Sequence, residues 1–301
     1  TVGEMSSTSI GACVEYTRPE NRELSMVFNF HHLKVDYASG RKWTLMDPDI
    51  PALKRLLNDW ALGLQDGGGW NALFWNNHDQ PRAIDRFGDA DRFRYESATM
   101  LATAIHLMRG TPYVYMGEEI GMSDPGYTTI EDYVDIEARN AFAELVAAGH
   151  EADEAFRIVH SKARDNARTP MQWDASASAG FTDGVPWLRP TNQDEVNVAH
   201  EEASGRILPY YRRLIALRKS VPVISGGAYE PYALDDPDIM AYVRHDEEHR
   251  LLVVCSFRGH ETGIDLPADF LGGEVLISNY PLRSLRERMS LRPYEALALL
   301  V

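Results

Sequence analysis

The sequence contains little cysteine, no long apolar run and no surplus of basic residues. Cys13 and Cys255 are the only cysteines among 301 residues, and they lie far apart in the chain. They form neither a metal-binding motif nor a disulfide framework, so we expect a reducing compartment, the cytoplasm. No run of 18 apolar residues occurs, so we expect no membrane span, and the first residues (TVGEMSSTSI) do not resemble a signal peptide.

The charge balance is acidic. Lys and Arg together number 30 against 45 Asp and Glu, which gives a formal net charge of −15. A protein that binds nucleic acid nonspecifically needs a basic surface, so we exclude that class. Adjacent side chains of an extended segment point in opposite directions, so His31 and His32 do not predict a shared metal site. We expect no cofactor and no resident metal.

Strand-like and helix-like segments alternate in the first two thirds of the chain. Short apolar runs typical of strands alternate with amphipathic segments of helical period. In chain order these are a strand at 24–30, a helix at 50–64, a strand at 72–75, a helix at 95–108 and a strand at 112–116. This order predicts an α/β fold with a parallel sheet.

The pattern changes after a last predicted helix at 208–219. Short strands separated by Gly, Asp and Pro follow at 239–244, 251–257, 275–280 and 296–301. We therefore predict a first domain at 1–222 and a small all-β domain, a β-sandwich, at 223–301.

Polar side chains follow each predicted strand of the first domain. His31 and His32 come after the first, the segment 76–79 (NNHD) after the second, and Glu118 and Glu119 after the third. Ligands of parallel sheets and barrels lie at the carboxyl ends of the strands, so these clusters predict one shared site.

Each candidate also has a structural interpretation. Glu4 is a general acid or an exposed surface carboxylate, and Lys34 binds an anion or is simply solvated. The segment 77–82 (NHDQPR) suits sugar hydroxyls but equally suits a turn with an ion pair. The segment 164–168 (RDNAR) offers two arginines to hydroxyls or carboxylates, or forms an ion-paired loop.

Taken together, four segments resemble the α-amylase family of glycoside hydrolases, in its α-glucosidase branch. They are TVGEM at 1–5, FWNNHDQPR at 74–82, GTPYVYMGEEIGM at 110–122 and RDNARTPMQW at 164–173. The resemblance implies the second half of a (β/α)₈ barrel, strands 5–8, followed by the all-β domain. The family's strand-4 motif with its nucleophilic Asp does not occur here, so the resemblance implies a C-terminal fragment that is inactive alone. Half a barrel also leaves open sheet edges, so we expect self-association.

The resemblance assigns roles to six residues. Glu4 is expected to be the catalytic general acid/base, and Asp79 the catalytic carboxylate that stabilises the oxocarbenium-like state. His78 and Arg168 are expected to bind sugar hydroxyls. The string HHLKVDY at 31–37 adds His32 and Lys34 to the substrate-binding residues, with Lys34 placed to meet a phosphate on the leaving sugar.

The implied activity is retaining α-glycoside hydrolysis. Segments 1–9, 28–37 and 70–82 are most similar to members that split trehalose 6-phosphate into glucose and glucose 6-phosphate. Two alternatives remain open: an oligo-1,6-glucosidase or other α-glucosidase of neutral sugars, and a non-catalytic interaction subunit of the same family.

Overall fold

In the computed structural model, which describes residues 1–301, a sheet of four parallel strands organises the first part of the chain. The strands are hydrogen-bonded in the order β1 (Val2–Met5), β2 (Met26–Asn29), β3 (Asn71–Leu73) and β4 (Thr111–Pro112). All three pairings are parallel, with Glu4 opposite Phe28 and Phe28 opposite Ala72. The carboxyl ends of the strands therefore meet at one edge of the sheet, as the sequence predicts.

Helices follow the strands in alternation, which confirms the predicted strand–helix order. Helix α1 (Ile10–Thr17) follows β1, α2 (Ile50–Asp66) follows β2, and α4 (Arg94–His106) lies between β3 and β4. Asp49 caps α2 by accepting a hydrogen bond from the Ala52 N–H at 2.8 Å. The apolar face of α2 is buried, including Leu53, Leu57, Trp60, Ala61 and Leu64.

Gly110 lets β4 pack closely on β3. Its φ angle of +141° lies in a region of backbone conformation that residues other than glycine rarely adopt. A Cβ at this position would lie 2.7 Å from the carbonyl oxygen of Asn71, on β3. Any larger residue would therefore push β4 away from its neighbour and displace the segment that follows it.

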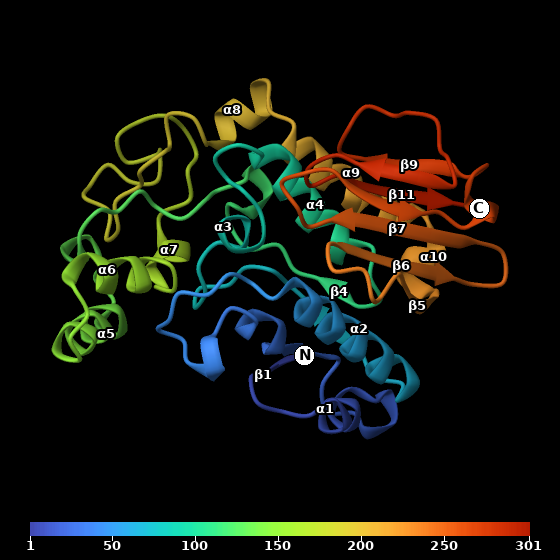
Figure 1. The fold of residues 1–301 in the computed structure, drawn as a ribbon, viewed down its shortest axis with the longest axis horizontal. Helices are drawn as coiled ribbons and strands as arrows, with labels where there is room; N and C mark the ends of the chain where they lie inside the picture. The colour runs from blue at the N-terminus through green and yellow to red at the C-terminus, as the bar shows by residue number, and fades with distance from the viewer.

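A long extension separates the parallel sheet from the last helices. It includes α5 (Ile136–Ala147), α6 (Ala152–His160), α7 (Asp165–Arg168) and α8 (Val198–Ala203), whereas the short helix α3 (Ala83–Phe87) lies earlier, between β3 and α4. Helices α5 and α6 have a small core of their own, around Tyr133 and Val159. They lie at the end of the molecule opposite the C-terminal strands (Figure 1). Between α7 and α8 the chain forms neither helix nor strand.

The last part of the chain is all-β after two helices, α9 (Ile207–Ser220) and α10 (Pro222–Gly226). Five antiparallel strands are hydrogen-bonded in the order β5–β6–β7–β11–β9, and β8 pairs with β10. Their bounds are β5 (Ala228–Tyr232), β6 (Ile239–His245), β7 (Arg250–Ser256), β8 (Thr262–Asp265), β9 (Glu274–Ser278), β10 (Arg288–Leu291) and β11 (Ala296–Leu300).

The two C-terminal sheets enclose a shared core. One face of the larger sheet packs with β8 and β10 around residues such as Val254, Ile264 and Leu291. The other face packs on α4 and α9, so the main core runs through both parts of the chain.

Short one-turn helices complete the fold: η1 (Pro19–Asn21), η2 (His31–Lys34), η3 (Ala38–Gly40), η4 (Glu118–Ile120), η5 (Ile130–Asp132) and η6 (Ala268–Phe270). No helix combines the length and apolar character that crossing a membrane requires.

Candidate active site

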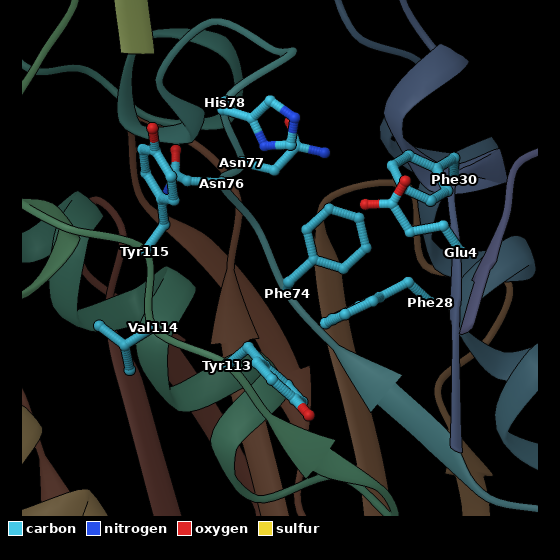
Figure 2. Close-up of a pocket in the computed structure, with 10 residues that line it drawn as sticks. All are labelled: Glu4, Phe28, Phe30, Phe74, Asn76, Asn77, His78, Tyr113, Val114 and Tyr115. Carbon is cyan, nitrogen blue, oxygen red and sulfur yellow. The ribbon is translucent and has the colours of Figure 1, made fainter. Parts of the chain in front are cut away.

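The carboxyl ends of the parallel strands surround a pocket of about 200 Å³. Glu4 of β1 lines it on one side, and Asn77 and His78, from the segment after β3, line it on the other. In Figure 2 the Glu4 carboxylate points into this space, toward the Phe74 ring. No hydrogen bond or ion pair within the chain engages the Glu4 carboxylate, so it faces the pocket free to act on a ligand.

Aromatic rings line the rest of the pocket. Phe28 and Phe74 meet edge to face with ring centroids 5.1 Å apart, and Phe30 lies 5.3 Å from Phe74. The ring centroids of Tyr113 and Phe28 are 4.7 Å apart. A carboxyl group bordered by aromatic rings is a common arrangement in sites that bind a small, partly apolar ligand. No pattern in the sequence singles out these rings, although Phe28 and Phe30 alternate in the 24–30 run.

Two arginines of the 164–168 segment hold Asp79. Arg168 donates from Nη2 to Asp79 Oδ1 at 2.8 Å and from Nε to the carbonyl oxygen of His78 at 2.6 Å. Arg164 Nη1 lies 3.6 Å from the same Asp79 oxygen. Arg164 also donates from Nε and from Nη2 to the two carboxylate oxygens of Asp135, each at 2.8 Å. The structure thus brings His78, Asp79 and Arg168 together although the arginine is about ninety positions away.

A buried carboxyl group supports the segment that carries His78 and Asp79. Glu118, on η4, accepts a hydrogen bond from Asn76 Nδ2 at 2.7 Å and another from the Tyr211 hydroxyl at 3.0 Å. Burial raises the pKa of Glu118 to about 7. Asn76 in turn accepts from the Ala83 N–H at 2.7 Å, so its side chain is fixed at both ends. Glu118 therefore lies behind the site and orients its backbone.

Lys34 lines an adjoining pocket of about 340 Å³ together with Glu4 and Asp79. Its Nζ donates to the carbonyl oxygen of Ser6 at 3.2 Å. Leu33 and Gln80 complete this side of the pocket. The lysine thus shares one concave surface with both predicted catalytic carboxylates, and its ammonium group has further donors to offer a ligand.

His32 occupies a different position from Lys34, its near neighbour in the chain. It is 4% exposed, lines neither pocket, and its Nε2 lies 3.0 Å from the carbonyl oxygen of Phe74. Because a carbonyl only accepts, Nε2 carries the proton of that hydrogen bond. Burial lowers the pKa of His32 to about 4. The imidazole ring also packs edge to face on the Phe74 ring, with ring centroids 5.1 Å apart. Because Phe74 itself lines the pocket, these contacts place His32 behind Phe74.

Arg82, the guanidinium of the 77–82 segment, is fully buried. It donates from Nη1 to the Met116 carbonyl oxygen at 2.6 Å and from Nη2 to the Ala167 carbonyl oxygen at 3.3 Å. For this arginine the structural interpretation of the 77–82 segment applies. Its side chain connects the segment that follows β4 to helix α7. The chain contains no group of three or more His, Cys, Asp or Glu side chains arranged to hold a metal ion.

Two known protein families match the chain. The family described as Alpha amylase, catalytic domain, matches residues 1–227. The family described as Alpha-amylase SusG C-terminal domain matches residues 239–297. These regions correspond to the parallel sheet with its helices and to the C-terminal strands.

Individual relatives match over almost the whole chain. Trehalose-6-phosphate hydrolase of Bacillus subtilis (strain 168) is 47% identical, over 99% of this chain and 54% of that protein. Oligo-1,6-glucosidase of Halalkalibacterium halodurans is 45% identical, over 98% of this chain and 54% of that protein. The crystal structure of Bacillus licheniformis trehalose-6-phosphate hydrolase superposes with a TM-score of 0.96 at 46% identity, covering 100% of this chain and 55% of the other.

The chain spans about half the length of the curated relatives it matches. The predicted fold class, strands of a (β/α)₈ barrel followed by an all-β domain, is confirmed by these matches and by the four parallel strands.

Proposed function

Because the chain belongs to the α-amylase family, we propose that it carries the acid/base side of a retaining α-glucosidase site. The observation that carries this proposal is that Glu4 and Asp79 line one pocket while Arg168 holds Asp79. One carboxyl group is free to exchange a proton, and the other is fixed by cations. Retaining hydrolysis needs an acid/base carboxyl group and a nucleophilic one, and the first of these roles is the one assigned to Glu4.

Glu4 acts in both chemical steps of the proposed reaction. As an acid it donates its proton to the glycosidic oxygen while the C1–O bond breaks and a carboxylate nucleophile bonds to C1. As a base it then removes a proton from water, which attacks C1 and releases the sugar with its original configuration. The position of the Glu4 carboxylate, pointing into the pocket without an internal partner, supports this assignment (Figure 2).

Asp79 stabilises the positive charge that develops on the sugar ring in the transition state of each step. A fixed carboxylate is most effective when it does not have to reorganise as the charge appears. The hydrogen bond from Arg168 Nη2 to Asp79 Oδ1 supplies that fixation from one side, and the turn bond from the Asp79 N–H to Asn77 Oδ1, at 2.9 Å, supplies it from the other. His78 lines the first pocket together with Glu4, where its ring is placed to bind sugar hydroxyls.

We further propose that the nucleophile comes from residues other than these 301. The first pocket contains one carboxylate, Glu4, and the second adds only Asp79. The outer strands of the sheet also leave apolar side chains exposed, among them Val2 on β1 and Tyr113 and Val114 after β4. Apolar side chains along open sheet edges are typical of surfaces that pack against further structure. Remaining strands of a complete barrel, or a second copy of the chain, fit these edges.

The proposed substrate is trehalose 6-phosphate. Lys34 supports it, because an ammonium group beside the acid/base carboxylate is placed to bind a phosphate on the leaving sugar. The similarity to trehalose-6-phosphate hydrolase supports it further. An α-glucosidase acting on neutral sugars is the second candidate, favoured by the 45% identity to an oligo-1,6-glucosidase.

Replacing Lys34 with alanine in the full-length gene product separates these two candidates. A hydrogen bond to a charged group is worth about 1.5–3 kcal/mol, so kcat/KM on trehalose 6-phosphate is expected to fall roughly 10- to 150-fold. A neutral α-glucoside lacks the phosphate, and its kcat/KM should change less than about threefold. Lys34→Arg should restore part of the loss, because the guanidinium is wider than the ammonium.

The matched control is Lys219→Ala, which removes an exposed lysine at the end of α9. It should leave both substrates unaffected. Equal losses on both substrates in Lys34→Ala would assign the lysine a structural role, and no loss on either would show that Lys34 is a solvated surface lysine that binds no phosphate.

A further inference from the structure

Asp36 lies at the centre of a buried ion cluster beneath the pocket that Lys34 lines. Arg86 donates to it twice, from Nη2 to Oδ1 at 2.8 Å and from Nε to Oδ2 at 3.2 Å. Lys162 donates from Nζ to Oδ2 at 2.6 Å. The three side chains are only 3–4% exposed. Buried ions of this kind are held only when each has a partner, so the three segments that carry them are fixed relative to one another.

Those three segments are the ones that supply the site. Asp36 comes two residues after Lys34, and Arg86 lies on α3, shortly after Asp79. Lys162 lies between α6 and α7, shortly before the segment that contains Arg164 and Arg168. No other buried ion cluster of the chain joins all three, so Asp36 is the common point of attachment.

Arg86 extends from this cluster to the pocket surface itself. Its Nη2 donates to the Leu33 carbonyl oxygen at 2.6 Å, and its Nη1 donates to Gln80 Oε1 at 3.1 Å. Leu33 and Gln80 both line the pocket shared by Glu4, Lys34 and Asp79. One guanidinium therefore fixes the residue before Lys34 and the residue after Asp79, while two of its other N–H groups are held by Asp36.

The charges of the cluster do not cancel. One carboxylate faces two cations, which leaves an excess of one positive charge behind the pocket. Burial acts to raise the pKa of Asp36, but Arg86 and Lys162 outweigh it and hold that pKa below its usual value. Asp36 is thus an anion at neutral pH, and the surplus charge favours an anionic group on the ligand side.

We propose that Asp36 is a positioning residue for substrate selectivity: through Arg86 it fixes Leu33, Lys34 and Gln80 at the geometry that accepts a phosphorylated leaving sugar. The inference rests on the proposed function, which it deepens by assigning selectivity to a residue that does not touch the substrate.

The test is Asp36→Asn in the full-length gene product, with kcat/KM measured on trehalose 6-phosphate and on trehalose. Misplacement of a binding group by about 1 Å can cost as much as 10²-fold, so we expect the ratio of the two kcat/KM values to fall about 10-fold. The loss should appear mainly as a higher KM for the phosphorylated sugar, since binding of the phosphate is shared by ground and transition states. Arg86→Lys keeps the charge but loses the fork, and should lower the same ratio even if Asp36→Asn does not fold.

The matched control is Glu295→Gln in the C-terminal strands. Glu295 is 2% exposed and, like Asp36, is held by two cations, Arg292 at 2.7 Å and Arg283 at 2.9 Å. It should lower thermal stability without changing the substrate ratio. An unchanged ratio in both Asp36→Asn and Arg86→Lys, with the preference of the unsubstituted protein intact, overturns this inference alone. An unsubstituted protein without preference for the phosphorylated sugar overturns the proposed substrate and the inference together.

Discussion

Replacing Glu4 with glutamine in the full-length gene product is expected to lower kcat on a disaccharide substrate by about 10²- to 10⁴-fold, the range that general acid–base catalysis supplies. The amide keeps the size and polarity of the side chain but has no proton to donate to the leaving oxygen. It also cannot accept the proton of the attacking water, so both steps of the reaction are slowed. The Glu4 carboxylate has no structural bond to lose, so stability should be preserved.

An activated substrate separates the two roles of Glu4. An aryl α-glucoside with an acidic phenol leaves without protonation, so its first step should be nearly unaffected in Glu4→Gln, and a burst of phenol should precede slow turnover. Azide attacks without losing a proton, so it should accelerate the second step and give a glycosyl azide of retained configuration. Glu20→Gln, at an exposed position of η1, is the control and should behave like the unsubstituted protein. Unchanged disaccharide turnover in Glu4→Gln would rule out the assigned role.

A polypeptide of residues 1–301 by itself is expected to show no measurable glycoside hydrolysis. The proposed double displacement needs a nucleophilic carboxylate opposite Glu4, and Asp79, the other carboxylate of the pocket, is engaged by Arg168. Loss of a nucleophile lowers kcat by about 10⁶-fold in a well-studied hydrolase, which would bring turnover close to background.

The comparison for this prediction is the full-length gene product, assayed at the same molar concentration on an aryl α-glucoside. The Glu4→Gln form of residues 1–301 sets the background of contaminating activity. Steady-state hydrolysis by residues 1–301 above that background would show that the segment contains its own nucleophile. Asp79 would then be the first residue to test in that role.

The sequence predicts those parts of the site that are contiguous along the chain. The strand–helix alternation predicts the parallel sheet because apolar periodicity reflects burial directly. Polar residues in the segments that follow the strands, such as His78 and Asp79, lie at one edge of the sheet because parallel strands share their carboxyl ends. The sequence singles out the two arginines of the segment 164–168 as candidate ligand-binding residues, but only the structure shows that both contact Asp79.

Features that depend on contacts between distant segments are not predicted. Asp36 meets Arg86 and Lys162 across 50 and 126 positions, and no local pattern indicates such a pairing. The direction of a single side chain is equally hidden, so His32 and Lys34 look equivalent in the sequence although only Lys34 lines a pocket.

Three C-terminal strands are also not predicted, for local reasons. Strand β5 contains Pro231 and lies at a sheet edge, where a missing N–H is tolerated. Strands β8 and β10 have four residues each and form a separate two-stranded sheet, and they contain Gly263 and the polar Arg288 and Ser290. Such short strands have too few apolar residues to stand out from loops.

The boundary between the two domains at 222 remains a prediction, since α10 and the main core continue across it.

The proposed substrate is tested by the kcat/KM of the unsubstituted full-length gene product, measured on trehalose 6-phosphate and on trehalose. The two substrates share the glucose and the bond that is cleaved, and they differ only in the phosphate that Lys34 is proposed to bind. A charge-assisted hydrogen bond of about 1.5–3 kcal/mol predicts a preference for the phosphorylated sugar of roughly 10- to 150-fold. Equal values on the two substrates, or a preference for trehalose, would contradict the account.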